Sequence, residues 1–160
     1  MASQTKTIEA KKDEFRAYLE KTGVVDQLTK FLIYGTAARS IIGDFLWFES
    51  TLNTGVAFSM FEGKSWIFVV ISAVASLVII TLLLGKKIIT KPSQKICLGL
   101  ILGGTIGNLI DRLVFDGVRD FIYLKFMNFA IFNVADMAIV CSVIVFCVFL
   151  IIDTFKKEKK

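Results

Sequence analysis

The chain has 160 residues, which is enough for about one domain, and 55% of them are hydrophobic, with a mean hydropathy of +0.69. Soluble domains are about 45–50% apolar even when glycine is counted, so this composition predicts a membrane protein. The sequence contains no histidine, which excludes a Ser-His or Cys-His nucleophile and a histidine-ligated zinc site. Three cysteines lie in apolar runs without CxxC spacing and predict neither a disulfide framework nor a metal site: Cys97, Cys141 and Cys147.

The net charge of +5 is distributed as expected for membrane topology rather than for nucleic-acid binding. Lysines crowd residues 86–95 and the tail at 156–160, whereas residues 111–132 balance their acids and bases. Basic segments at alternate ends of the spans follow the positive-inside rule. We therefore expect a basic cytoplasmic tail at 156–160, with the C-terminus in the cytoplasm, and no nucleic-acid partner.

Residues 1–30 predict a charged amphipathic helix, with Gly23 as its weak point. Charges are frequent between residues 6 and 21, and each would cost about 2.5–3.5 kcal/mol at the centre of a bilayer, so this part is not a span. The pattern leaves open whether the helix lies on the membrane, packs on the protein or is solvated. Its apolar and small residues recur at helical spacing: Phe15, Tyr18, Leu19, Thr22, Val25, Leu28 and Leu32.

Residues 31–65 predict a small extracytoplasmic subdomain rich in β-strand and loop. This segment mixes aromatic and β-branched residues with glycines, a composition typical of short strands and turns. Residues 44–61 in particular predict a bent hairpin or a small sheet.

Residues 66–155 predict a small bundle of membrane-spanning helices. Residues 66–84 carry no charge and are long enough to cross a hydrocarbon core of about 30 Å at 1.5 Å per residue. Residues 96–110 form a second, shorter apolar run, and residues 129–152 form the last one. The expected fold is an α-helical integral membrane protein with three clear spans.

The last two spans run in opposite directions, so they bring Asp111 and Asp136 to a similar depth near the outer face. The loop predicted at 111–136, which contains Asp120, must lie there as well. Carboxylates this close to long apolar segments are costly and point to a function. Two carboxylates that share a proton and hold a water form the active unit of an aspartic protease. Paired acids facing a membrane cavity are equally expected of a proton relay in a transporter.

A stripe of small residues runs along the second predicted span. Gly99, Gly103 and Gly107 are spaced by four residues, and Asp111 continues the stripe. Small residues at this spacing let membrane helices approach closely. The stripe ends in Asn108 and Asp111, which share a helix face and are expected to be buried against a partner helix or a cavity.

The last span opens on the pattern Asn-x-x-Asp, formed by Asn133 and Asp136. This pattern predicts an Asn N-cap with an acid that benefits from the positive end of the helix dipole. Asp136 is then the acid more easily kept ionised, and a nearby Asp120 is expected to hold a proton.

Five sequence blocks stand out along the chain: DQLTK at 26–30, NTGVAFS at 53–59, GGTIGNLIDR at 103–112, GVRDF at 117–121 and FNVAD at 132–136. In this order they resemble the signature blocks of the signal peptidase II family, the bacterial lipoprotein signal peptidases. The resemblance implies an integral inner-membrane aspartic endopeptidase with its active site near the extracytoplasmic face. Such enzymes remove the signal peptide of a prolipoprotein just before its diacylglyceryl-modified cysteine.

The resemblance also implies the roles of individual residues. The catalytic pair would be Asp120 and Asp136, with no cofactor and no metal. The partners would be the diacylglyceryl-prolipoprotein substrate and membrane lipid, and we expect a monomer. Val56 stands where the family commonly has alanine, which would narrow the substrate site. The supporting or substrate-binding residues would be Asn53, Gly55, Asn108, Asp111, Arg112, Asn133, Asp26 and Lys30.

The N-terminus departs from the family pattern, which has four spans. The family's first span is an apolar helix that ends near the block at 26–30, whereas residues 6–21 of this chain are charged. Residues 24–46 carry too many charges to enter the bilayer comfortably.

Three alternative functions stay open: a Ser-Lys peptidase using Ser59 and Lys64, a small proton-coupled carrier, and a non-catalytic homologue that binds lipidated signal peptides.

Overall fold

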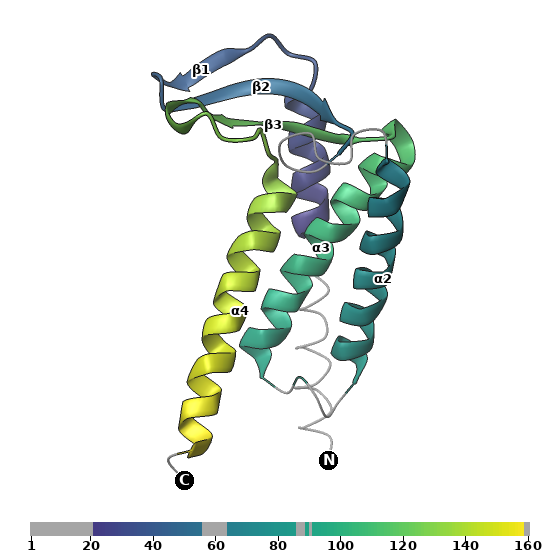
Figure 1. The fold of residues 1–160 in the computed structure, drawn as a ribbon, viewed down its shortest axis with the longest axis vertical. Coiled ribbons are helices and arrows are strands. Elements are labelled where there is room, and N and C mark those ends of the chain that lie inside the picture. The colour runs from purple at the N-terminus through teal and green to yellow at the C-terminus, as the bar shows by residue number, and fades with distance from the viewer. Residues whose placement is uncertain (1–20, 56–63, 86–88, 90, 159–160) are drawn as a thin grey trace.

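The computed structural model describes residues 21–55, 64–85, 89 and 91–158. Within them, a bundle of helices carries a small antiparallel sheet across one end (Figure 1). The helices are the one at residues 21–33, α2 (Ser65–Leu84), α3 (Pro92–Phe115) and α4 (Val134–Glu158); the strands are β1 (Arg39–Ile42), β2 (Leu46–Asn53) and β3 (Val118–Leu124), followed by the short 3-10 helix η2 (Lys125–Met127).

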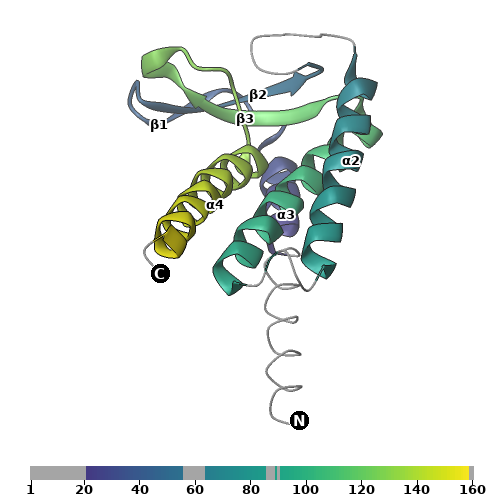
Figure 2. The ribbon, with the colours of Figure 1, turned by 60° about the horizontal axis from the view of Figure 1, so that its bottom comes forward.

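Three helices are long and apolar enough to cross a membrane: α2, α3 and the Val134–Lys156 part of α4. Only 11% of the apolar window of α2 and of α4 is buried, against 50% of that of α3. Helix α3 is therefore the central helix, with α2 and α4 on either side of it in both views (Figures 1 and 2). The outward faces of α2 and α4 are apolar and exposed, as expected for surfaces in contact with lipid. The predicted membrane bundle with a small β-rich subdomain is confirmed.

Helix α3 is longer than the predicted run at 96–110. It begins at Pro92, because proline is favoured in the first turn, where its missing N–H leaves no hydrogen bond unmade. It continues through Asp111, whose charge is neutralised inside the protein, and ends where Asp116 adopts the left-handed conformation with φ of 55°.

The prediction of a loop over 111–136 is wrong for most of its length. This segment contains the last turn of α3, then β3 and η2, and α4 begins at Val134 rather than at 129. Strand β3 pairs antiparallel with the central strand β2, whose other edge carries β1. Phe132 bridges to Ile122 on β3, so the chain enters α4 directly from the sheet. The bent hairpin or small sheet predicted for residues 44–61 lies earlier in the chain than predicted: β1 and β2 form the hairpin, and only β2 falls inside the predicted range. Residues 56–61 lie outside the described residues.

The described part of the N-terminal segment is a helix with inverted polarity. Asp26 and Lys30 are fully buried, whereas Val24 and Phe31 are 63% and 76% exposed. The charged face packs against α3 and α4, and the apolar face is turned outward. Asp26 and Lys30 are among the charges that made residues 24–46 seem unsuited to the bilayer. They are paired inside the bundle instead. Residues 1–20 lie outside the described residues, so the amphipathic helix predicted for 1–30 is observed only from residue 21 onward.

Candidate active site

Polar side chains from five elements meet beneath the sheet, at one end of the bundle. They come from the 21–33 helix, α3, β2, β3 and the start of α4. The largest fully buried side chains of the described chain are mostly polar or charged: Lys30, Phe121, Leu102, Asn133, Asp26, Asp111 and Asp120.

One group of these residues is a charge-balanced cluster around Asp111. The Nη2 of Arg119 lies 2.8 Å from Asp111 Oδ1, and the Arg119 backbone N–H donates to Oδ2 at 2.9 Å. Lys30 Nζ lies 3.2 Å from the same carboxylate and 2.8 Å from Asp26 Oδ2. Two buried carboxylates thus face two buried cations, the arrangement that a low-dielectric interior requires.

Gln27 completes this cluster and was not singled out from the sequence. Its Nε2 donates to Asp111 Oδ1 at 3.1 Å and to the Gly107 carbonyl at 3.0 Å, and its Oε1 accepts from Arg119 at 2.8 Å. Gln27 and Arg119 both lie inside the matched blocks, next to residues that were assigned roles. Their positions beside those residues were the only sequence signal that could have identified them.

Asp26 joins the N-terminal helix to the last one. Its Oδ1 accepts a hydrogen bond from the Ala135 backbone N–H at 3.0 Å, which satisfies one of the free donors in the first turn of α4. The Asp26 side chain has room only because residue 107 is a glycine, since a Cβ there would lie 2.6 Å from Asp26 Oδ2. The close approach of α3 to α4 depends on Gly104, where a Cβ would lie 2.7 Å from the Ala135 carbonyl oxygen. The glycine stripe predicted from the sequence did not include this position.

Asn133 forms a reciprocal cap with Asp136 at the start of α4. Its Oδ1 accepts from the Asp136 backbone N–H, and its own backbone N–H donates to Asp136 Oδ2, both at 3.1 Å. The predicted N-cap is therefore present. Because Oδ1 is used in the cap, the amide nitrogen of Asn133 points the other way. It donates to Asp120 Oδ1 at 2.6 Å and to Asn108 Oδ1 at 3.1 Å.

Asp120 and Asp136 are therefore brought together around one residue. Asp120 comes from β3 and Asp136 from α4, and both carboxylates bond to Asn133. Asn53, at the end of β2, donates to Asp120 Oδ2 at 3.0 Å, and Asn108 donates to Asp136 Oδ1 at 2.7 Å. The hydrogen-bond donors to this pair are side-chain amides and a backbone N–H, all of them neutral.

The Asn53 side chain is oriented by the turn that follows β2. Its Oδ1 accepts from the Gly55 backbone N–H at 3.1 Å, which turns its amide nitrogen toward Asp120. The chain after Gly55, with Val56 and Ser59, lies outside the described residues. The alternative Ser59–Lys64 pair is therefore not tested; Lys64 itself is exposed.

Burial raises the pKa of Asp120 from its ordinary value of 3.8 to about 7, with the neighbouring Asp136 as the second cause. Hydrogen bonds from Asn53 and Asn133 act in the opposite direction. A carboxyl group that titrates near neutral pH is suited to general acid–base catalysis.

Two cations lie close to this pair without neutralising it directly. Lys30 Nζ donates to Asn108 Oδ1 at 2.9 Å, which turns the Asn108 amide nitrogen toward Asp136. Arg112 is attracted electrostatically by Asp136 and Asp120, and its guanidinium lies over the Phe68 ring on α2.

The comparisons with known proteins agree on one family. Residues 22–152 match the family model described as signal peptidase (SPase) II, while a model described as c-Myc-binding protein matches only residues 9–34. The chain is 39% identical over 142 residues to a lipoprotein signal peptidase of Brevibacillus brevis, covering 85% of this chain and 91% of that protein. It is also 39% identical over 133 residues to a lipoprotein signal peptidase of Enterococcus faecalis, covering 81% and 82%.

Solved structures agree with the sequence relatives. A bacterial membrane enzyme determined by the in meso method at 2.3 Å resolution superposes with a TM-score of 0.83 at 26% identity, covering 92% of this chain and 93% of that one. A second such structure, at 1.9 Å resolution, gives a TM-score of 0.77 at 26% identity and covers 86% and 92%.

Proposed function

The chain belongs to the signal peptidase II family, a family of membrane peptidases that cleave lipoprotein signal peptides, and on this premise we propose that it does so by aspartic chemistry at Asp120 and Asp136. The scissile bond is the one just before the diacylglyceryl-modified cysteine of the prolipoprotein. The relatives give no support to a proton-coupled carrier, a non-catalytic homologue or a Ser-Lys peptidase.

One observation supports this proposal above the others: a single residue, Asn133, holds both carboxylates. Its backbone N–H bonds Asp136 and its side-chain amide bonds Asp120, so the two acids are kept close enough to interact electrostatically. Two such acids share a proton, because both cannot ionise easily side by side.

We assign the base to Asp136 and the acid to Asp120. We assign the negative charge of the pair to Asp136, because its carboxylate lies in the first turn of α4, at the positive end of the helix dipole, and accepts from the Asn133 backbone N–H there. It takes a proton from a water molecule, whose oxygen attacks the scissile carbonyl carbon. Protonated Asp120 gives its proton to the carbonyl oxygen.

The tetrahedral intermediate then collapses with the same two groups in reversed roles. Asp136 passes the proton it gained to the leaving amine of the cysteine, and the C–N bond breaks. Asp120 takes back a proton as the new carboxyl group forms, which returns the pair to its starting state.

The remaining residues are proposed to position this pair. Asn53 and Gly55 orient Asp120 from the strand side, and Asn108 orients Asp136. Arg112 supplies positive potential nearby. The cluster of Asp26, Gln27, Lys30, Asp111 and Arg119 keeps α3, α4 and the 21–33 helix in register beneath the sheet.

The chain is a bacterial inner-membrane protein, and we propose that its active site faces the extracytoplasmic side. Lys91, the N-cap of α3 at the far end of the bundle, pairs there with Asp153 near the end of α4. Basic residues at the end opposite the sheet support a cytoplasmic location for that end and for the C-terminus. A substrate would present its signal helix among the spans and its acyl chains to the bilayer. We propose that one chain is sufficient.

The direct test is cleavage of a diacylglyceryl-modified prolipoprotein by the full chain in liposomes, with product mass measured. Asp120→Asn and Asp136→Asn should each abolish turnover, because each removes one partner of the shared proton. Asp116→Asn is the matched control, since Asp116 ends α3 in a conformation that asparagine also adopts. Normal turnover by either of the first two variants would contradict the proposed mechanism.

A further inference from the structure

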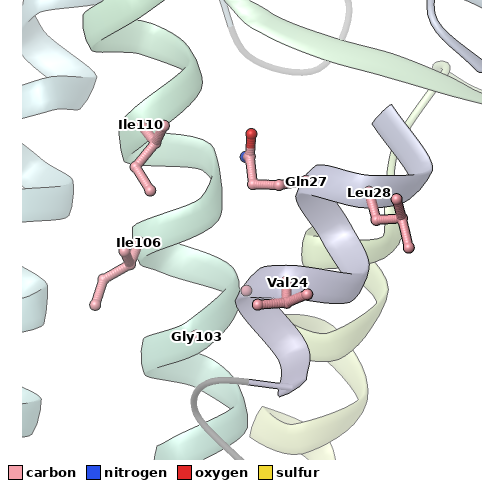
Figure 3. Close-up of a pocket in the computed structure, with 7 residues that line it drawn as sticks. Val24, Gln27, Leu28, Gly103, Ile106 and Ile110 are labelled. Carbon is pink, nitrogen blue, oxygen red and sulfur yellow. The ribbon is translucent and has the colours of Figure 1, made fainter. Parts of the chain in front are cut away.

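A groove of about 530 Å³ runs between the 21–33 helix and α3. Val24 and Leu28 form one wall, and Ile106 and Ile110 form the other (Figure 3). The helices are closest at Gly23, where a Cβ would lie 3.9 Å from the Gly103 carbonyl oxygen. They diverge from there toward the sheet (Figure 3).

The groove lies on the back of α3 relative to the carboxylate pair. Successive residues of an α-helix are turned by about 100°, so Ile106 and Ile110, each two residues from Asn108, point about 200° away from it. Asn108 faces Asp136. A substrate held at the pair is therefore on the opposite side of α3.

The groove is apolar and lies at membrane depth, since one of its walls is part of the spanning helix α3. Val24 and Leu28 are 63% and 51% exposed and continue the outward apolar face of the 21–33 helix. The one polar side chain of the groove, Gln27, reaches across toward α3 (Figure 3). Its amide is already bonded to Asp111, Arg119 and the backbone. A ligand in this groove can therefore make only apolar contacts with its lining.

The surroundings of the groove select its occupant. One wall belongs to the spanning helix α3, and Val24 and Leu28 on the other wall are exposed, so the groove opens toward the bilayer. The apolar molecules in contact with such a surface are lipid acyl chains, and an acyl chain that fills the groove makes dispersion contacts that an empty groove lacks.

We propose that this groove is a binding site for an acyl chain of a bilayer phospholipid, separate from the site that takes the substrate. The chain lies between the 21–33 helix and α3 and covers Gln27 on its outer side. It thereby keeps water away from the hydrogen bonds that Gln27 makes to Asp111 and Arg119. The site is independent of cleavage and does not depend on the proposed function.

Photolabelling of the full chain tests this proposal. The chain is reconstituted in vesicles of phosphatidylethanolamine and phosphatidylglycerol that contain a phosphatidylglycerol with a diazirine in one acyl chain. After irradiation, labelled residues are mapped by mass spectrometry. Label per residue at Leu28, Ile106 and Ile110 should exceed several-fold that at Val70 and Val74. These two residues are exposed on the outward face of α2 and report ordinary lipid contact.

Filling the groove should remove this excess. Ile106→Trp and, separately, Leu28→Trp should reduce the groove label to the level of α2, whereas Val74→Trp on α2 should leave it unchanged. Leu28 is half exposed, so its variant keeps the test open if Ile106→Trp does not fold. Circular dichroism of each variant confirms folding.

Three results would overturn the proposal. Equal labelling of the groove and α2 would mean that no site exists. Displacement of the label by an excess of diacylglyceryl-modified substrate peptide would assign the groove to the substrate. A dominant crosslink between two copies of the chain at Ile106 or Ile110 would make the groove a protein interface.

One result would support the separation of the two sites. Loss of cleavage in Asp120→Asn with the groove label retained would show that the two sites are independent, as proposed.

Discussion

Two pairs of carboxylates lie beneath the sheet, and they differ in what balances their charge. Asp26 and Asp111 contact Lys30 and Arg119 directly and form a neutral cluster. Asp120 and Asp136 are held by amide and backbone N–H donors.

On the proposed mechanism, this difference separates the structural acids, Asp26 and Asp111, from the reactive ones, Asp120 and Asp136. A buried carboxylate that contacts its own cation cannot be removed without leaving that cation unpaired, so its loss is strongly destabilising. A carboxylate held by neutral donors can exchange a proton near neutral pH, as the pKa of about 7 for Asp120 indicates. We expect a substitution in the first pair to lower mainly the free energy of unfolding, and one in the second to change mainly catalysis and its pH dependence.

The largest expected effect on stability comes from breaking the neutral cluster. Asp111→Asn removes the acid that faces both Lys30 and Arg119 and leaves positive charge buried without compensation. We expect the free energy of unfolding to fall by about 3–5 kcal/mol. Unfolding in mixed micelles, followed by circular dichroism, measures it. A loss below about 1 kcal/mol, typical of exposed pairs, would show that the cluster is not structural.

The next largest effect is expected in the pH dependence of the free energy of unfolding, which should distinguish Asp120 from the acids that contact a cation. The folded pKa of Asp120 lies above its unfolded value of 3.8, so the folded state binds more protons between pH 3.8 and about 7. Stability therefore falls as pH rises through this window, by up to about 4 kcal/mol. Asp120→Asn should lose this dependence in the same unfolding assay. If Asp120 is the acid, kcat/KM should also fall above pH 7. An unchanged stability profile in the variant would contradict this assignment.

The contribution of Asn133 can be divided into its cap and its side-chain amide. Asn133→Ser keeps an oxygen that can accept from the Asp136 backbone N–H but removes the donor to Asp120. We expect kcat/KM to fall about 10²-fold through loss of orientation, with stability nearly unchanged. Asn133→Ala should lose the same activity and also about 1 kcal/mol of stability. Equal stability of the two variants would show that the cap is dispensable.

The smallest expected effect concerns the glycine beneath Asp26. Gly107→Ala places a methyl group 2.6 Å from Asp26 Oδ2 and should weaken its bond to Ala135, at a cost of about 1–3 kcal/mol. Gly23→Ala is the matched control. Its Cβ would meet the Gly103 carbonyl oxygen only at ordinary contact distance, so better helix propensity should offset any loss. Thermal unfolding of both variants would decide, and equal destabilisation would contradict the close packing at Gly107.

The spans could be predicted from the sequence because lipid imposes a simple rule on them. The uncharged run at 66–84 coincides almost fully with α2, since no charged residue interrupts it. The hydropathy pattern predicted an end of this helix before Asp111, which is too early. Hydropathy counts the charge of Asp111 but not the ion pair that this residue forms with Arg119. Strand β3 could not be found in this way. Its first four residues are all buried, so the alternation that marks a strand with one wet face is missing.

The site residues could be predicted only as a set, not as an arrangement. Asn133 and Asp136 are close in sequence, so their cap followed from local spacing. Asp26 and Lys30 could not be placed from the sequence, because a charged segment near a membrane is ordinarily expected to face water. Their burial depends on partners in α3 and α4 that only the folded chain brings near. Gln27 escaped notice for the same reason.

The hydrogen bond from Ala135 to Asp26 joins residues 109 positions apart in the chain. It therefore has a consequence for biogenesis. A nascent polypeptide that has inserted everything before α4 has neither the second acid nor the helix terminus onto which Asp26 docks. On the proposed mechanism, hydrolytic activity then arises only after α4 has been synthesised, and translation products that stop before α4 would be inert in the membrane.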